Sequence, residues 1–290
     1  MTAHSRGLRE LCGLLGYSTQ AYYQYLKATE RRSFGQEEFV QQVLAYRREQ
    51  PRIGTRKLFS LLQPAIGRDA FFVLLRESGL LVRQKRRHAR TTFSYHRFRK
   101  YPDLVKEMVI DRPGQLWVSD ITYIRMGEGF AYLSLVTDAY SRKVIGFSMS
   151  HDLSTDNCLQ ALKMALKQWE GDHPLVHHSD RGIQYCSGAY TELLKQNGIS
   201  ISMTQSGNPR DNAIAERVNG ILKMELLQER YADISSARQS IRQAVVIYNT
   251  LRPHSSLDMM TPEQAHRLTG PIKRRWQNYY PVKQQYADVV

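Results

Sequence analysis

Three acidic residues stand where a carboxylate has no packing reason to be. Asp120 lies within the apolar stretch WVSDITYI, where an ionised carboxylate costs several kcal/mol unless it is paired or bound to a metal. Asp180 ends the predicted strand that contains HHSD, and open α/β sheets place their sites at the carboxyl ends of strands. Glu216 follows on a predicted helix, with 35 residues between it and Asp180.

Glu216 shares one face of its predicted helix with Gly220 and Lys223. At about 100° per residue, these three positions fall within roughly 40° of one another. Apolar residues gather on the opposite side of the wheel: Ile214, Val218, Ile221 and Leu222. A glycine in a helix costs about 1 kcal/mol relative to alanine, so Gly220 indicates close approach by something bulky. We therefore expect this face to look toward metal and DNA.

The three carboxylates predict metal-dependent phosphoryl transfer. Hard oxygen ligands suit Mg²⁺, with Mn²⁺ as a substitute. Two such ions about 3.5–4 Å apart can activate an attacking oxygen and stabilise a leaving one. We predict that Asp120, Asp180 and Glu216 are both the catalytic residues and the metal ligands. The spacing alone decides little, because the chain has 27 acidic residues among 290; the strand and helix context carries the prediction.

The charge balance favours a polyanionic partner. The chain has a formal net charge of +14, which suits nucleic acid or an anionic membrane surface. It contains no run of about 18 apolar residues and no apolar signal-peptide core near its beginning. Cysteines with no metal-binding spacing fit reduced, buried thiols in a cytosolic protein: Cys12, Cys158 and Cys186. Nucleic acid is thus the leading partner class.

The first third of the chain reads as helical. Residues 7–27 predict two short helices around Gly16-Tyr17-Ser18, with Ser18 as an N-cap, which resembles a helix-turn-helix. Further helices are predicted up to Pro51, over 55–62 and over 68–79, and they form a module with basic edges at Arg56 and Lys57. On periodicity alone this module could equally bind protein.

Residues 83–100 carry eight Lys or Arg residues and no acid, with aromatic residues between them. A solvated basic linker is one reading; an arm that follows DNA phosphates fits the composition better. The residues of this arm predicted to bind DNA are Arg83, Lys85, Arg86, Arg87 and Arg90.

From residue 115 the pattern changes to an α/β domain. Strands are predicted over 116–125, 131–136 and 144–150 as an antiparallel meander. Helices over 155–169 and 187–197 then alternate with strands over 175–179 and 199–204, before the helix of Glu216 and a last helix over 235–251. This order predicts a mixed sheet with helices on its faces.

Several polar residues near the candidate site have plainer readings. Asp138 is predicted to be a turn residue rather than a fourth ligand. His177 and His178 are expected to be hydrogen-bonded core histidines rather than site residues. Asn208 and Asn212 would order the loop before Glu216 or simply cap the helix.

Taken together, these motifs resemble the second-frame (OrfB) transposases of the IS-three family of insertion sequences. The resemblance rests on WVSDITYI, LVTDAYSRKVIGF, HHSDRGIQY and NPRDNAIAERVNGILKMEL, with YNTLRPHSSLDMMTPEQA after them and IGTRKLFSLL with RESGLL before. It covers roughly residues 8–268. It implies a ribonuclease-H-like, retroviral-integrase-like fold in which Asp120, Asp180 and Glu216 form the metal-binding triad, and in which Lys223 contacts DNA near the element's end.

The resulting expectation is a DNA transposase that cleaves transposon ends and joins the freed 3′-hydroxyl to DNA. Its expected partners are terminal inverted repeats, target DNA, further copies of the chain on DNA, and the upstream-frame product. Its expected location is the bacterial cytoplasm, at the nucleoid. The rival readings are a ribonuclease-H-like nuclease that only hydrolyses and a catalytically idle DNA-binding regulator.

The predicted domain organisation has four parts. Residues 1–30 form the helix-turn-helix-like hairpin, and residues 36–95 form the helical DNA-binding module with its basic arm. Residues 113–232 form the catalytic core, and residues 233–290 form the C-terminal helix and basic tail.

Overall fold

A computed structural model describes residues 3–82, 97–106, 108–169, 171, 173–205 and 212–273, without the side chains of 3–6 and 28–34. The chain divides into two compact units, Met1–Arg83 and Gln84–Val290. The predicted DNA-binding residues Arg83, Lys85, Arg86, Arg87 and Arg90 lie outside the described residues, as does Asn208. No helix in the described part of the chain is both long and apolar enough to cross a membrane.

The first unit begins with two helices, α1 (Ala3–Leu14) and α2 (Thr19–Glu49). Ser18 caps α2 as predicted, because its side chain accepts a hydrogen bond from the backbone N–H of Ala21. The prediction of a short second helix is wrong. α2 runs for 31 residues, so it also includes the stretch predicted as the next helix and crosses the predicted junction between residues 30 and 36.

The C-terminal part of α2 packs with α3 (Thr55–Leu62) and α4 (Arg68–Glu77). Their shared core consists of buried apolar side chains from all three helices and the turn between them: Val43, Ile53, Leu58, Phe71 and Leu75. Between residues 7 and 27, in contrast, Cys12 is the one buried side chain. The apolar core of this unit therefore lies around α3 and α4 and not in the α1–α2 hairpin.

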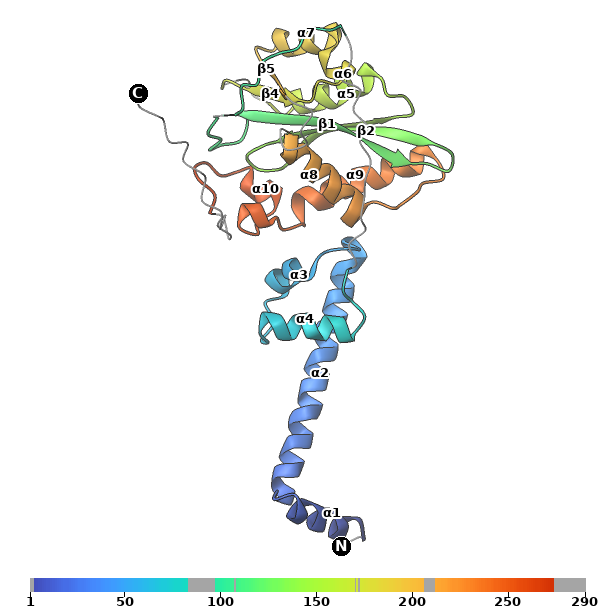
Figure 1. Cartoon of the computed structure of the whole chain (residues 1–290), viewed down its shortest axis with the longest axis vertical. Coiled ribbons are helices and arrows are strands. Elements are labelled where there is room, and N and C mark those ends of the chain that lie inside the picture. The colour runs from blue at the N-terminus through green and yellow to red at the C-terminus, as the bar shows by residue number, and fades with distance from the viewer. Residues whose placement is uncertain are drawn as a thin grey trace, which may run out of the picture. The chain divides into compact units, whose positions relative to one another are not determined.

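The second unit contains a mixed sheet (Figure 1). Its strands within the described residues are β1 (Leu116–Arg125), β2 (Phe130–Asp138), β3 (Val144–Ser150), β4 (Val176–Ser179) and β5 (Ser200–Met203), in the order β3-β2-β1-β4-β5. β1, β2 and β3 pair antiparallel, as the short loops predicted. β4 joins β1 in parallel, and β5 joins β4 in parallel.

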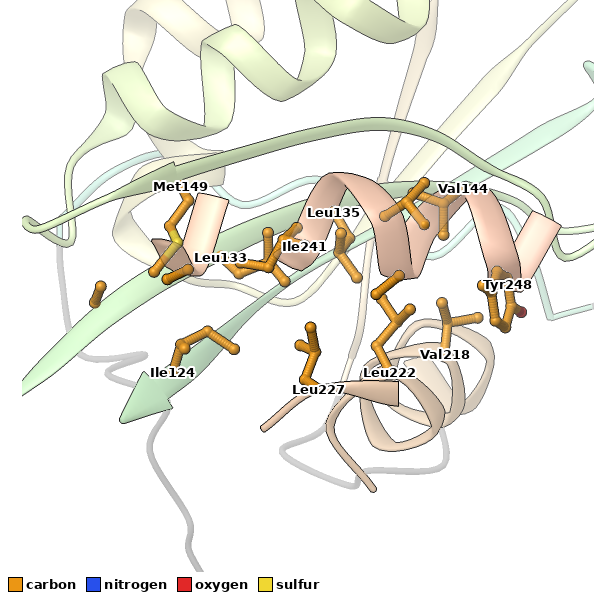
Figure 2. Close-up of a cluster of buried hydrophobic side chains, with 14 of the residues drawn as sticks. Ile124, Leu133, Leu135, Val144, Met149, Val218, Leu222, Leu227, Ile241 and Tyr248 are labelled. Carbon is orange, nitrogen blue, oxygen red and sulfur yellow. The ribbon is translucent and has the colours of Figure 1, made fainter. Parts of the chain in front are cut away.

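Helices cover both faces of this sheet (Figure 1). α5 (Thr155–Leu166), α6 (Ile183–Cys186) and α7 (Gly188–Gln196) lie on one face, over a core that includes Trp117 and Val136. α8 (Ala213–Ile221) and α9 (Ile234–Thr250) lie on the other face. There they pack on Leu133 and Leu135, as Figure 2 shows. A 3-10 turn (Ser255–Leu257) and α10 (Pro262–Ala265) follow.

The helix of Glu216 begins after its N-cap Asn212, one of the two asparagines expected at its start, and differs from its prediction at its C-terminal end. Beyond Ile221 the chain forms a π turn, η2 (Leu222–Leu226), in which the N–H of Leu227 donates to the carbonyl of Leu222 at 2.9 Å. A π turn holds one more residue than an α turn. Lys223 therefore lies in a widened turn and not in a regular helix.

Candidate active site

Asp120 lies in the central strand β1, half-buried, on the face covered by α8. One carboxylate oxygen accepts from the N–H of Ile121 at 2.9 Å, and the other accepts from Nδ2 of Asn219 at 2.7 Å. Burial raises the pKa of Asp120 to about 7, and the charges of Asp180 and Glu216 raise it further against the lowering effect of the two hydrogen bonds. Its negative charge is therefore poorly compensated by the protein.

Asp180 comes directly after β4 and beside Asp120. The parallel register pairs Val118 with His178, so continuing it by two positions brings the two aspartates side by side at the end of β4. The N–H of Gly182 donates to Oδ1 of Asp180 at 2.9 Å. A Cβ atom at position 182 would lie 2.9 Å from the same oxygen. Gly182 thus allows the backbone to fold tightly around this carboxylate.

Glu216 projects from the first turn of α8 and is exposed. Its pKa is raised, first by partial burial and then by the charge of Asp180. Three hydrogen bonds fix α8 and η2 along β1: Asn212 Nδ2 to the carbonyl of Ser119 at 2.9 Å, Asn219 Nδ2 to Asp120, and Lys223 Nζ to Oγ1 of Thr122 at 2.9 Å. The fold therefore brings the face predicted for Glu216 and Lys223 against the strand of Asp120.

The three carboxylates influence one another's ionisation. Asp180 raises the pKa of Asp120 and of Glu216, and Glu216 also raises that of Asp120. Among the described residues, no three His, Cys, Asp or Glu side chains are grouped closely enough to hold a metal ion as they stand. The three carboxylates nevertheless fit a divalent cation, because such an ion would relieve the repulsion between their negative charges. Oδ1 of the neighbouring Asn219 is buried with no hydrogen-bond partner in the described structure.

The histidines before Asp180 are core residues, as predicted. His177 Nε2 lies 2.8 Å from Oγ of Ser119 and 3.0 Å from the hydroxyl of Tyr190, and burial lowers its pKa to about 3. His178 Nδ1 lies 2.8 Å from Oγ of Ser202. Both rings are almost fully buried, so they belong to the packing that fixes β4.

Asp138 is the turn residue that the sequence predicted. It is completely buried, and it accepts hydrogen bonds from the N–H of Gly114 at 2.8 Å and from the N–H and hydroxyl of Ser141 at 2.8 and 2.7 Å. Asn212 anchors its loop through Ser119 and makes no side-chain cap bond. Arg56 and Lys57, on α3, are exposed and half-buried respectively.

Two residues that make contacts at the site, Asn219 and Thr122, are not identified by the sequence analysis. Asn219 lies three positions after Glu216, on the side of the helix that faces β1, and this i, i+3 spacing is a signal that could have identified it. Thr122 lies two positions after Asp120 and therefore on the same face of the strand. Neither was singled out, because an asparagine and a threonine are unremarkable in these elements.

Comparison with known proteins places this arrangement in a family. The integrase core domain family matches residues 110–209, and a second integrase core domain family matches residues 197–262. A solved structure of the HTLV-2 integrase catalytic core domain, in complex with magnesium, matches with a TM-score of 0.43 and 20% identity, covering 53% of this chain and 97% of that one. The fold assignment, ribonuclease-H-like, rests on the sheet order and on the family matches.

Relatives of similar length include named transposases. The "Insertion element IS600 uncharacterized 31 kDa protein" of Shigella sonnei is 32% identical over 272 residues, which are 90% of this chain and all of that protein. "Transposase InsF for insertion sequence IS3A" of Escherichia coli strain K12 is 30% identical over 268 residues, 89% of this chain and 93% of that protein. The chain therefore belongs to the insertion-sequence transposases with an integrase-like core.

Proposed function

We propose that this DNA transposase performs its chemistry at Asp120, Asp180 and Glu216, cleaving transposon ends and joining the freed 3′-hydroxyl to DNA. The observation that carries the proposal is geometric: the parallel register of β1 and β4 sets Asp180 beside Asp120, and the helix of Glu216 is hydrogen-bonded to Asp120 through Asn219. The integrase-core family is typically metal-dependent. We propose two Mg²⁺ ions, with Mn²⁺ as a substitute, as the ions that these carboxylates hold.

Bound there, the ions would activate the attacking oxygen and stabilise the leaving oxygen of each phosphodiester exchange. The protein supplies the geometry. Asn219 and the N–H of Ile121 orient the carboxylate of Asp120, and the N–H of Gly182 orients that of Asp180. Glu216 completes the set from a helix that is hydrogen-bonded to the same strand as Asp120. No protein nucleophile is required, because water and then the DNA 3′-hydroxyl attack.

DNA is the substrate of transposases, and positive charge supports its binding here. Lys223 lies on the Glu216 side of α8 and η2, where it would grip the DNA end. Arg56 and Lys57 at the start of α3, together with the arm residues predicted above, would bind backbone phosphates. The packed core around α3 and α4 makes these two helices the better candidate for a DNA-binding module than the α1–α2 hairpin.

Cleavage and joining need two DNA ends and a target. We therefore propose that the chain binds terminal inverted repeats as a homo-multimer, with the upstream-frame product as a further partner. Its proposed place is the bacterial nucleoid.

The test is strand transfer in vitro with labelled DNA carrying the element's own end, with and without Mg²⁺. Glu216→Gln should abolish joined products while DNA binding persists. Glu192→Gln, which neutralises an exposed glutamate on α7, serves as the matched control and should join DNA like the wild type. Cleavage without joining would favour a hydrolytic nuclease. DNA binding with no metal-dependent product would favour an idle regulator.

A further inference from the structure

A widened helical turn carries the candidate DNA contact and directly follows the helix of the candidate catalytic glutamate. Glu216 belongs to α8, whereas Lys223 belongs to the π turn η2. The side chain of Lys223 reaches Oγ1 of Thr122, two positions from Asp120 on the same strand. A π turn is rare and is frequently found at functional sites, and the direction of Lys223 depends on what holds η2 in place.

Arg252 holds η2 from the end of α9. Its Nε donates to one oxygen of Glu225 at 2.8 Å, and its terminal Nη2 donates to the other at 2.9 Å. The guanidinium also donates to the carbonyl of Pro253 at 3.3 Å and lies 5.9 Å from the ring centroid of Tyr248. The side chain of Arg252 is 2% exposed and that of Glu225 is 19% exposed. Two hydrogen bonds from one guanidinium thus hold the carboxylate of Glu225, which lies within η2.

Stability alone does not account for this pair. Burying a guanidinium and a carboxylate costs desolvation energy that their attraction barely offsets, and apolar side chains of the same size often stabilise a core equally well. Apolar neighbours are plentiful here, since Val218, Leu222 and Tyr248 meet in the same cluster (Figure 2). A planar bidentate fork provides what apolar packing does not, namely a fixed direction.

We infer that Arg252 is a positioning residue for DNA-end binding, which acts through Glu225 and the π turn to fix the direction of Lys223. Arg252 itself does not touch DNA, because it is buried behind η2. This inference rests on the proposed function, in which Lys223 grips the DNA end. It assigns a role to a residue that follows the last member of the carboxylate triad by 36 positions.

The first part of the test measures the turn without any DNA. Arg252→Lys keeps the charge but removes the fork, and Glu225→Gln removes the charge from the more exposed partner. Hydrogen exchange of the peptide covering residues 222–227 reports on the Leu227 N–H. Each variant should exchange there at least about tenfold faster than the wild type. Unchanged exchange in both variants would overturn the inference.

The control is a second ion pair of the same unit, in which Nζ of Lys143 lies 2.8 Å from Oε2 of Glu263. Glu263→Gln removes this pair together with the one that Glu263 makes with Arg267 at 3.5 Å. Both partners of the Lys143 pair are partly buried, and Glu263 lies 37 positions beyond the end of η2. Exchange in residues 222–227 should stay at the wild-type rate in this variant. Equal acceleration in Glu263→Gln would show that any lost ion pair loosens the unit, and would overturn a specific role for Arg252.

The second part is a double-mutant cycle on DNA joining. Arg252→Lys should raise the KM for the DNA end by about tenfold to about 100-fold, with a smaller effect on kcat. In a Lys223→Ala background the same substitution should change KM little, because the group being positioned is gone. An equal effect of Arg252→Lys in both backgrounds, or a wild-type KM in Lys223→Ala alone, would overturn the inference.

The two parts separate this inference from the proposed function. If the wild-type chain joins no DNA under any condition, the proposed function fails, but the hydrogen-exchange result still decides whether Arg252 holds the turn. If joining occurs and the exchange and KM effects are absent, only the role of Arg252 fails.

Discussion

Two aspartates on neighbouring strands show how differently the same side chain can be used. Asp138, at the end of β2, is completely buried, and three donors serve its two oxygens. Asp120, in the middle of β1, is only half-buried. Its carboxylate accepts two hydrogen bonds, and the charges of two other acids, Asp180 and Glu216, raise its pKa.

The contrast shows that burial is a poor guide to function in this domain. The more buried aspartate accepts three hydrogen bonds, two from Ser141 in its own turn and one from the N–H of Gly114. The less buried one carries a pKa of about 7, because desolvation and like charges outweigh its donors. An under-compensated charge at the meeting point of several elements is the better mark of a functional site.

Replacing the satisfied aspartate should cause the largest loss of stability. Asp138→Asn exchanges an acceptor oxygen for an amide group that faces the N–H of Gly114 or of Ser141. We expect the free energy of unfolding to fall by about 3 to 5 kcal/mol. Urea denaturation followed by circular dichroism measures this. A loss below about 1 kcal/mol would mean that the carboxylate of Asp138 does not stabilise the fold more than that of Asp120 does.

Replacing Asp120, whose charge is poorly compensated, should increase the free energy of unfolding instead of lowering it. The folded-state pKa of Asp120, about 7, lies above the ordinary value of 3.8 for an aspartate, so the folded protein binds this proton more tightly than the unfolded chain. Stability should therefore be lost as pH rises from about 4 to about 7 and should then level off. Asp120→Asn removes that loss and should be more stable than the wild type by about 2 kcal/mol above about pH 7, a figure reduced for partial exposure.

Thermal unfolding of the same two proteins tests metal binding without DNA. Mg²⁺ should raise the melting temperature of the wild type above about pH 7, because it compensates the ionised carboxylates. Asp120→Asn should respond much less. A wild type that is as stable as Asp120→Asn across this pH range, in the presence of a chelator, would remove the distinction between the two aspartates.

The smallest effect is expected at Gly220, on the open side of the Asp120 site. A Cβ atom there meets nothing within 4 Å in the described structure. Gly220→Ala should stabilise the helix by about 1 kcal/mol. If DNA approaches this face, the same methyl group should weaken DNA-end binding, seen as a higher KM for joining. A stabilised variant with an unchanged KM would show that DNA does not approach the helix at Gly220.

The sequence predicted local elements well where turn residues bracket them. Helix α3 and strands β1 and β3 match their predicted bounds, because glycine, proline or charged residues lie close to the ends of each run. A break is predicted between residues 27 and 36, but α2 continues through this stretch, which includes Gly35. A glycine inside a long helix costs only about 1 kcal/mol, which the helical residues on both sides of it offset.

The acids of the candidate site could be predicted from the sequence, but the residues that hold them in place could not. An acid in an apolar strand or at a strand end can be recognised from its neighbours in sequence. The contacts of Asn219 with Asp120, of Lys223 with Thr122, and of Arg252 with Glu225 span 99, 101 and 27 positions respectively. Such pairings depend on the register of helices against strands, which local patterns do not determine.

The parallel pairing of β1 with β4 determines when, during synthesis, the candidate catalytic centre can form. β1, β2 and β3 are joined by short turns and can pair as soon as residue 150 has left the ribosome. Val118 and His178 are paired although 60 positions separate them, and Glu225 meets Arg252 only after α9 has been made. At about 5–20 residues per second, a nascent chain carries a folded meander for several seconds before its carboxylates can converge. The ability to cut DNA is thus one of the last properties that the growing chain acquires.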